Sequence, residues 1–115
     1  MNIAESRERG VTVLKIGSPR IDAAAAGDLR SSLAAVVARG INRFVIDLSA
    51  VTFIDSTGLG ALVASLKLTG ASGRVLVAGA RDAVATLFRL TRMDRVFRLY
   101  PTAGEAAAAL AAEPA

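Results

Sequence analysis

Residues 45–60 read Val-Ile-Asp-Leu-Ser-Ala-Val-Thr-Phe-Ile-Asp-Ser-Thr-Gly-Leu-Gly, and this stretch decides the expected fold class. It begins within a continuous apolar run, residues 44–46, which is typical of a strand covered on both faces in a parallel sheet. Beyond it, apolar side chains recur at the i, i+3, i+4, i+7 spacing of a packed helix: Leu59, Leu62, Val63 and Leu66. We therefore expect a buried strand that leads through residues 55–58 into a helix.

The rest of the chain extends this alternation of strands and helices. Residues 3–7 and 11–16 predict a β-hairpin with its turn at residues 8–10, and Asp22 is expected to cap a helix that ends at Gly40. Further expected elements are a strand at 75–78, a helix carrying Val84, Leu87, Phe88 and Met93 that frays near Thr91, a strand at 96–100, and an alanine-rich helix within residues 103–115. The sequence thus predicts one α/β domain over residues 1–115, with a mixed, mostly parallel sheet of about five strands and about four helices.

The composition excludes several kinds of chemistry. The chain has no cysteine and no histidine, so it has no disulfide framework, no zinc site of the usual kind and no histidine general base. It has no tryptophan and few other aromatic residues, which argues against a base-stacking surface for nucleic acid. No apolar stretch approaches the roughly 18 residues of a membrane span, and no signal peptide is visible. We expect a soluble cytoplasmic protein that binds neither nucleic acid nor membrane.

The net charge is +4, and most basic residues are arginines. Four of them recur at every third position: Arg89, Arg92, Arg95 and Arg98. Two interpretations remain open for this arginine stripe. It is either an ordinary solvated surface or a surface for an acidic partner or a phosphate group.

Residues 55–60 are the one segment that indicates chemistry. They follow a strand and open a helix, where unpaired backbone N–H groups and the helix dipole stabilise a phosphate or a carboxylate. In open α/β sheets, functional sites also lie beyond the carboxyl ends of the strands. Gly58 and Gly60 leave the turn free of side-chain bulk, which allows another backbone to approach.

Four interpretations of this segment compete on spacing alone. It can be a plain helix cap at Asp55 or Ser56, or a nucleotide cradle, although the rest of a phosphate-binding fingerprint is missing. A carboxylate pair would join Asp55 to Asp22 or Asp47. A serine nucleophile would lack its base, because there is no histidine and only two lysines, Lys15 and Lys67. We therefore do not expect an enzyme.

The same segment resembles the signature of STAS domains, and most closely that of bacterial anti-sigma factor antagonists, also called anti-anti-sigma factors. The resemblance spans nearly the whole chain. Ile21-Asp22 is similar to a Leu-Asp pair of the family, and residues 90–97, Leu-Thr-Arg-Met-Asp-Arg-Val-Phe, are similar to its Leu-Thr-Gly-Leu-Asp-Arg-Val-Phe run. The resemblance implies a STAS fold for the single domain.

The resemblance also implies a function. In the family, a cognate anti-sigma factor that is also a serine kinase phosphorylates the residue after the motif aspartate, which is Ser56 here. The dephosphorylated antagonist binds that kinase and releases a sigma factor, and a serine phosphatase removes the phosphate. ATP and magnesium belong to the kinase, so no cofactor of the chain itself is implied. The implied partner-binding residues are Asp22, Asp55, Ser56, Thr57, Gly58, Leu59 and Gly60, with Thr57 as the second candidate acceptor.

Three features depart from the family pattern. Arg92 stands where the family usually has glycine, and the link from Leu66 to Val75 is about one residue shorter than usual. The net charge is positive where related antagonists are often acidic. An alternative function has the same fold but involves no phosphorylation switch. STAS domains also serve as scaffold subunits of ABC-type lipid transporters or other regulatory complexes, in which phosphorylation plays no role.

Overall fold

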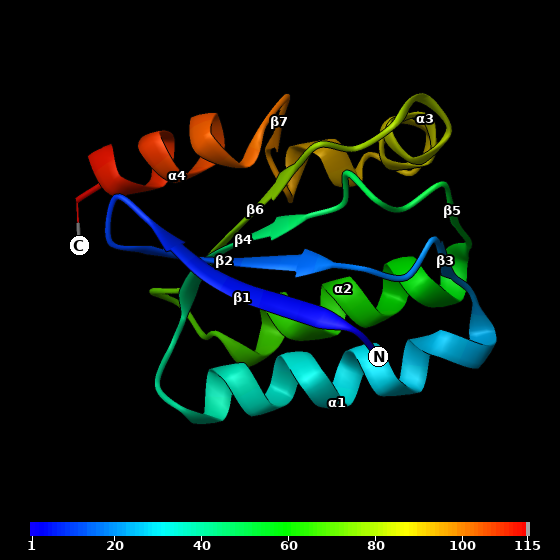
Figure 1. The fold of residues 1–115 in the computed structure, drawn as a ribbon, viewed down its shortest axis with the longest axis horizontal. Helices are drawn as coiled ribbons and strands as arrows, with labels where there is room; N and C mark the ends of the chain where they lie inside the picture. Colours follow the sequence, from blue (N-terminus) through cyan, green and yellow to red (C-terminus); the bar gives the residue numbers. More distant parts are fainter. Residues whose placement is uncertain (115) are drawn as a thin grey trace.

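The main sheet has five strands in the order β1-β2-β4-β6-β7 (Figure 1). A computed structural model describes residues 1–114. Its strands are β1 (Ile3–Glu8), β2 (Val11–Ile16), β4 (Arg43–Asp47), β6 (Arg74–Ala78) and β7 (Leu99–Tyr100). Only β1 runs antiparallel to its neighbour, and every other pairing in this sheet is parallel. The predicted mixed, mostly parallel sheet is confirmed.

The β1–β2 hairpin closes through a two-residue loop. Glu8 pairs with Val11, so the loop is Arg9-Gly10 and is one residue shorter than the sequence predicted. Both loop residues have positive φ angles, 51° and 77°, as a type I′ turn requires. The Arg7 guanidinium donates a hydrogen bond of 2.6 Å to the Gly10 carbonyl and braces the loop.

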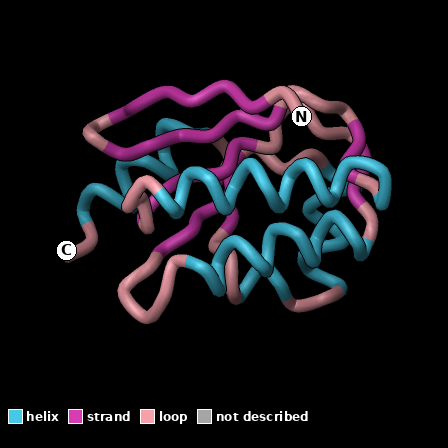
Figure 2. The backbone as a smooth tube through the Cα atoms, turned by 90° about the horizontal axis from the view of Figure 1, so that it is seen from below, coloured by secondary structure: helices cyan, strands magenta, loops and turns pink. Residues whose placement is uncertain are grey.

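Helices cover both faces of the sheet. The helices of the described chain are α1 (Ala23–Ala38), α2 (Ser56–Leu68), α3 (Asp82–Leu90) and α4 (Ala103–Ala112). Figure 2 shows α1 and α2 side by side on one face, whereas α4 lies across the other. Within residues 1–114, no helix combines the length and apolar character that crossing a bilayer requires.

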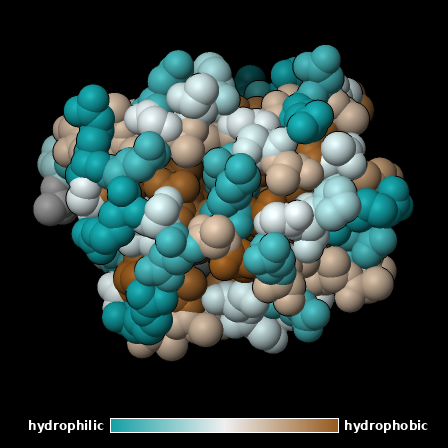
Figure 3. Space-filling model, in the orientation of Figure 1, coloured by the Kyte–Doolittle hydropathy of each residue, from teal (hydrophilic) through white to brown (hydrophobic). Residues whose placement is uncertain are grey.

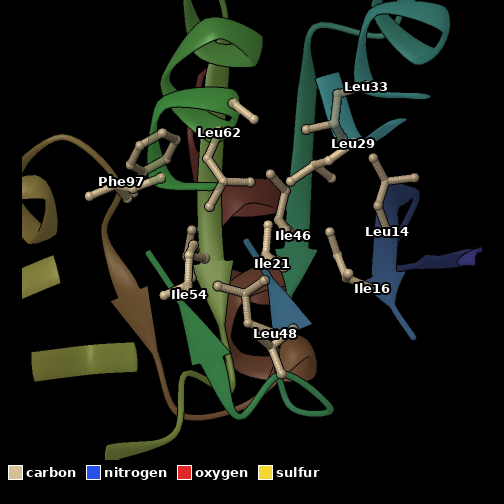
Figure 4. Packing of buried hydrophobic residues seen from close by; sticks show 14 of the residues in the cluster. Leu14, Ile16, Ile21, Leu29, Leu33, Ile46, Leu48, Ile54, Leu62 and Phe97 are labelled. Carbon is tan, nitrogen blue, oxygen red and sulfur yellow. The ribbon is translucent and has the colours of Figure 1, made fainter. Parts of the chain in front are cut away.

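The sheet separates two hydrophobic cores. The larger lies between the sheet and the α1–α2 layer, and its buried side chains include Leu14, Ile46, Leu29, Leu33 and Leu62 (Figure 4). The smaller lies under α4 and consists of Val13, Val45, Leu76, Ala78, Ala106 and Leu110. Each large side chain buried in this way contributes about 1.5–3 kcal/mol to folding. In Figure 3, hydrophilic residues are interleaved with small hydrophobic areas over one face.

The region after α3 differs from the prediction. A 3₁₀ helix, η1 (Met93–Arg95), follows α3, so Met93 lies outside the helix to which its spacing assigned it. The N–H groups of Val96 and Phe97 both bond to the Met93 carbonyl, which keeps the chain turning. The last strand is therefore confined to Leu99–Tyr100 instead of spanning residues 96–100. The physical cause is Arg92, whose left-handed backbone (φ 60°) turns the chain before η1.

A second, two-stranded sheet was absent from the prediction. It pairs β3 (Arg20–Ile21) with β5 (Phe53–Ile54) in parallel. No strand was expected at residues 20–21 or 53–54. This small sheet lies at the end of the molecule where α1 and α2 both begin (Figure 1).

Candidate partner-binding site

The β3–β5 pair brings two distant segments of the chain together. Arg20 pairs with Phe53, and Ile21 pairs with Ile54. Because both strands run in the same direction, the next residues, Asp22 and Asp55, leave the pair side by side. The N–H of Asp55 donates to the Ile21 carbonyl at 3.2 Å and extends the contact by one more residue.

Asp22 and Asp55 then cap the two neighbouring helices. The Asp22 carboxylate accepts hydrogen bonds from the N–H groups of Ala24 and Ala25, at 3.1 and 3.3 Å. The Asp55 carboxylate accepts one from the N–H of Gly58 at 2.9 Å. This confirms Asp22 as the cap of α1, and it shows that Asp55, not Ser56, caps α2. Each carboxylate thus satisfies first-turn N–H groups that otherwise lack a partner.

Gly58 allows the first turn of α2 to lie against β3. A Cβ atom placed on Gly58 would collide with the Ile21 carbonyl oxygen and would lie 2.7 Å from Cγ2 of Ile21. Gly60 differs, because a Cβ atom there meets nothing within 4 Å. Gly58 therefore serves the protein's own packing, whereas Gly60 leaves open space at a partly exposed point of the helix surface.

Ser56 and Thr57 are the exposed residues of this turn. They are the first two residues of α2. Within residues 1–114, neither hydroxyl makes a side-chain hydrogen bond. A solvent-facing hydroxyl at a helix start is accessible to a modifying enzyme, and a negative charge placed there meets the positive end of the helix dipole.

Some of the implied partner-binding residues are exposed at the surface, and others are buried beneath it. Asp22, Asp55 and Gly60 are partly exposed and lie around Ser56 and Thr57. Gly58 is buried, and Leu59 is only 6% exposed and belongs to the larger core. The side chain of Leu59 therefore supports the turn from beneath, which differs from its expected place as an interface neighbour.

The remaining candidate acid, Asp47, lies apart from this turn. It is the last residue of β4 in the main sheet, and its carboxylate accepts the N–H of Ser49 at 2.9 Å. Asp22, Asp47 and Asp55 therefore each bind backbone N–H groups of their own segment. Within the described residues, no group of three or more histidine, cysteine, aspartate or glutamate side chains is arranged to hold a metal ion.

Sequence reasoning missed the pair Arg20 and Phe53. Phe53 is 38% exposed, and the guanidinium carbon of Arg20 lies 4.1 Å from the centre of its ring. The same guanidinium lies 3.7 Å from the Asp22 carboxylate. This cation–π pair places an exposed aromatic ring next to the turn. A hint was present in the sequence, because Ile54 must point inward and Phe53, its neighbour in a strand, must then point outward.

Comparison with known proteins assigns this arrangement to a family. Residues 2–106 match the STAS domain. The anti-sigma-F factor antagonist RsfB of Mycobacterium tuberculosis is 34% identical over 106 residues, which are 92% of this chain and 86% of RsfB. The crystal structure of an anti-sigma factor antagonist from Mycobacterium paratuberculosis superposes with a TM-score of 0.85 at 34% identity, over 95% of this chain and 92% of that one.

A more distant structure, the Bacillus cell fate determinant SpoIIAA in its phosphorylated form, shares the fold. Its TM-score is 0.70 at 16% identity, over 95% of this chain and 99% of that one. The chain belongs to the STAS domain family, in the group of the bacterial anti-sigma factor antagonists. The expected family and fold are thereby confirmed.

Proposed function

We propose that this chain is a non-enzymatic anti-sigma factor antagonist that phosphorylation of Ser56 switches off. In its dephosphorylated form it binds a cognate anti-sigma factor with serine kinase activity, and a sigma factor is released. A serine phosphatase restores the binding form. The single observation that carries the proposal is the exposed Ser56 hydroxyl directly after the capping Asp55. The names of the relatives and the phosphorylated form of SpoIIAA support the same function.

The free protein is suited to carry a phosphate at this position. Phosphorylation adds about −1.5 to −2 charge at neutral pH. At the first position of α2, this charge meets the positive end of the helix dipole and the N–H groups of the first turn. The hydroxyl is exposed, so no packed side chain has to move. Modification is therefore expected to leave the fold intact.

Phosphorylation of Ser56 is expected to weaken the complex with the anti-sigma factor. A partner that covers the turn removes water from the phosphate, and Asp55 and Asp22 add negative charge on the same side. Unpaired charge enclosed in an interface costs several kcal/mol, and each ~1.4 kcal/mol is tenfold in affinity. The modification therefore acts on the choice of partner.

We propose that the partner contacts an exposed surface around the acceptor. Ser56, Thr57 and Gly60 form its centre, and Asp22 and Asp55 lie at its rim. Gly58 and Leu59 hold this surface in place from within. Phe53, with Arg20 stacked on it, adds the kind of aromatic and arginine anchor that dominates many interfaces.

The direct test is phosphorylation by the cognate kinase. The full chain is incubated with the purified anti-sigma factor and ATP, and its peptides are analysed by mass spectrometry. One phosphate on Ser56 is expected, with none on a Ser56→Ala control that retains Thr57. An unmodified Ser56 under conditions in which the kinase is active, or a phosphate on Thr57 alone, would overturn the assignment of the acceptor.

A further inference from the structure

The turn between α3 and β7 carries an exposed basic and aliphatic surface, which we call the arginine corner. It consists of Arg89, Arg92, Arg95, Leu90 and Val96. Its aliphatic side chains face solvent, with Leu90 77% exposed and Val96 39% exposed. The N–H of Arg92 bonds to the Arg89 carbonyl at 3.1 Å, and the N–H of Arg95 bonds to the Arg92 carbonyl at 3.2 Å. These successive tight turns gather three arginines into one compact corner.

The arginine stripe expected from the sequence is therefore divided. Arg98 lies near Glu113, at the end of α4. The pKa of the Glu113 carboxyl is lowered mainly by its hydrogen bonds with Arg74, and the charge of Arg98 adds to the effect. Arg89, Arg92 and Arg95 stay at the corner. Within residues 1–114, none of these three has a carboxylate within the 4.0 Å of an ion pair, in contrast to Arg39 with Glu5.

Arg92 occupies this corner at a conformational cost. Its φ of 60° and ψ of 20° lie in the left-handed region, which favours glycine. The Arg92 side chain is exposed and makes no side-chain hydrogen bond within the described residues, so no such bond offsets this cost. The fold uses the left-handed backbone at this point but has no need of an arginine side chain there, and this is a reason to look for a binding role.

We propose that the arginine corner is a docking surface for an acidic segment of a partner protein that also carries aliphatic side chains. Carboxylates match the forked guanidinium groups, which bind them through paired hydrogen bonds. Leu90 and Val96 offer an apolar contact that aliphatic side chains of a protein can fill and that a nucleic-acid backbone does not. The corner exposes no aromatic side chain for base stacking, and it lacks the long apolar face with which helices bind a bilayer.

This proposal does not depend on phosphorylation of Ser56. The corner belongs to the end of α3, the turn at Arg92, η1 and Val96, whereas Ser56 belongs to α2. Binding at the corner is therefore expected to be equal in the wild type and in a Ser56→Asp variant. A negative result for the arginine corner would therefore not contradict the phosphorylation of Ser56, and the reverse also holds.

The test uses the ¹⁵N-labelled full chain and a synthetic peptide of alternating glutamate and leucine, at about 0.15 M salt, where long-range attraction is screened. Chemical-shift changes are expected at residues 89–96. Replacing all three corner arginines with glutamine is expected to weaken binding about tenfold. The control replaces three exposed arginines elsewhere, Arg7, Arg9 and Arg30, with glutamine and is expected to change affinity less than about twofold.

Additional variants and ligands test whether both the charge and the aliphatic side chains of the corner take part in binding. Leu90→Ser is expected to weaken peptide binding, and so is glutamine in place of every glutamate of the peptide. Thermal melting confirms that each variant folds. Equal losses in the two arginine variants, shift changes outside the corner, or unchanged binding by Leu90→Ser would overturn the proposal. Tighter binding of phosphatidylserine vesicles or of single-stranded RNA at the same residues would also overturn it.

Discussion

Asp22 and Asp55 are equivalent caps on neighbouring helices, and the parallel pairing of Ile21 with Ile54 places them side by side. Their backbones are nearly the same, with φ and ψ of −111° and −171° at Asp22 and −107° and −177° at Asp55. The candidate site is therefore built from two helix starts held by one short strand pair. Its geometry depends on backbone hydrogen bonds more than on flexible side chains.

The caps can be tested by removing their carboxylates one at a time. Asp22→Ala and Asp55→Ala are each expected to lower the free energy of unfolding by about 1 kcal/mol, because first-turn N–H groups lose their acceptor. Asn at either position keeps an acceptor oxygen and is expected to restore most of the loss. Urea denaturation measures both effects. Equal stability of an alanine variant and the wild type would contradict the capping role.

The two glycines of the turn are expected to respond in opposite directions. Gly58→Ala is expected to cost about 3 kcal/mol, because its methyl group collides with the backbone of Ile21. Gly60→Ala, on an open part of the same helix, is expected to stabilise the fold by about 0.5–1 kcal/mol. It is nevertheless expected to weaken partner binding, since the methyl group enters the contact surface. Denaturation and calorimetry together distinguish these effects.

A negative charge at residue 56 is expected to weaken partner binding without destabilising the fold. Ser56→Asp should bind the anti-sigma factor at least about tenfold more weakly than Ser56→Ala, through repulsion and desolvation. The aspartate carries less charge than a phosphate, so the effect is a lower limit. Isothermal titration calorimetry measures the affinities, and thermal melting checks the fold. Equal affinities of the two variants would rule out an electrostatic switch.

Arg92 offers a test of backbone strain. Arg92→Gly is expected to raise the free energy of unfolding by about 0.5–1 kcal/mol, because relief of the left-handed strain exceeds the added entropy of the unfolded chain. Arg92→Ala retains Cβ and serves as the matched control, with no gain expected. A stability equal to the wild type for both variants would show that the turn is unstrained.

Acid is expected to loosen the end of α4. The Arg74 guanidinium binds the Glu113 carboxylate through two hydrogen bonds of 2.7 and 2.9 Å and lowers the pKa of Glu113 below its ordinary 4.5. A lowered pKa in the folded state means that the stabilisation is present above pH 4.5 and is lost as the pH falls through the lowered value. Glu113→Gln should therefore remove part of the acid dependence of unfolding, measured by urea denaturation between neutral and acidic pH. An unchanged pH profile would contradict this contribution.

Much of the fold followed from periodicity. The strand at residues 44–46 was predictable because a short continuous apolar run is typical of a strand buried on both faces. The helix through Leu59 and Leu66 was predictable because its apolar residues recur at helical spacing. Asp22 was predictable as a cap because its carboxylate acts on N–H groups only a few residues away. These features depend on residues that are close together in the sequence, so the sequence alone predicts them.

The missed features depend on distant segments or on backbone conformation. Two-residue strands such as β3 and β5 have no periodicity, so only the register of Ile21 with Ile54 reveals the second sheet. The stacking of Arg20 on Phe53 depends on the same register. The short last strand follows from the left-handed turn at Arg92, a conformation that arginine rarely adopts.

The salt bridge of Arg74 with Glu113 has a practical consequence. It fastens the end of α4 near the start of β6, and Figure 1 shows the end of α4 on the opposite side of the molecule from the start of α2. A fluorophore or a solid support joined at the end of α4 would therefore leave Ser56 unobstructed. Sensor experiments that immobilise the protein in this way would present the acceptor serine uniformly to a kinase in solution.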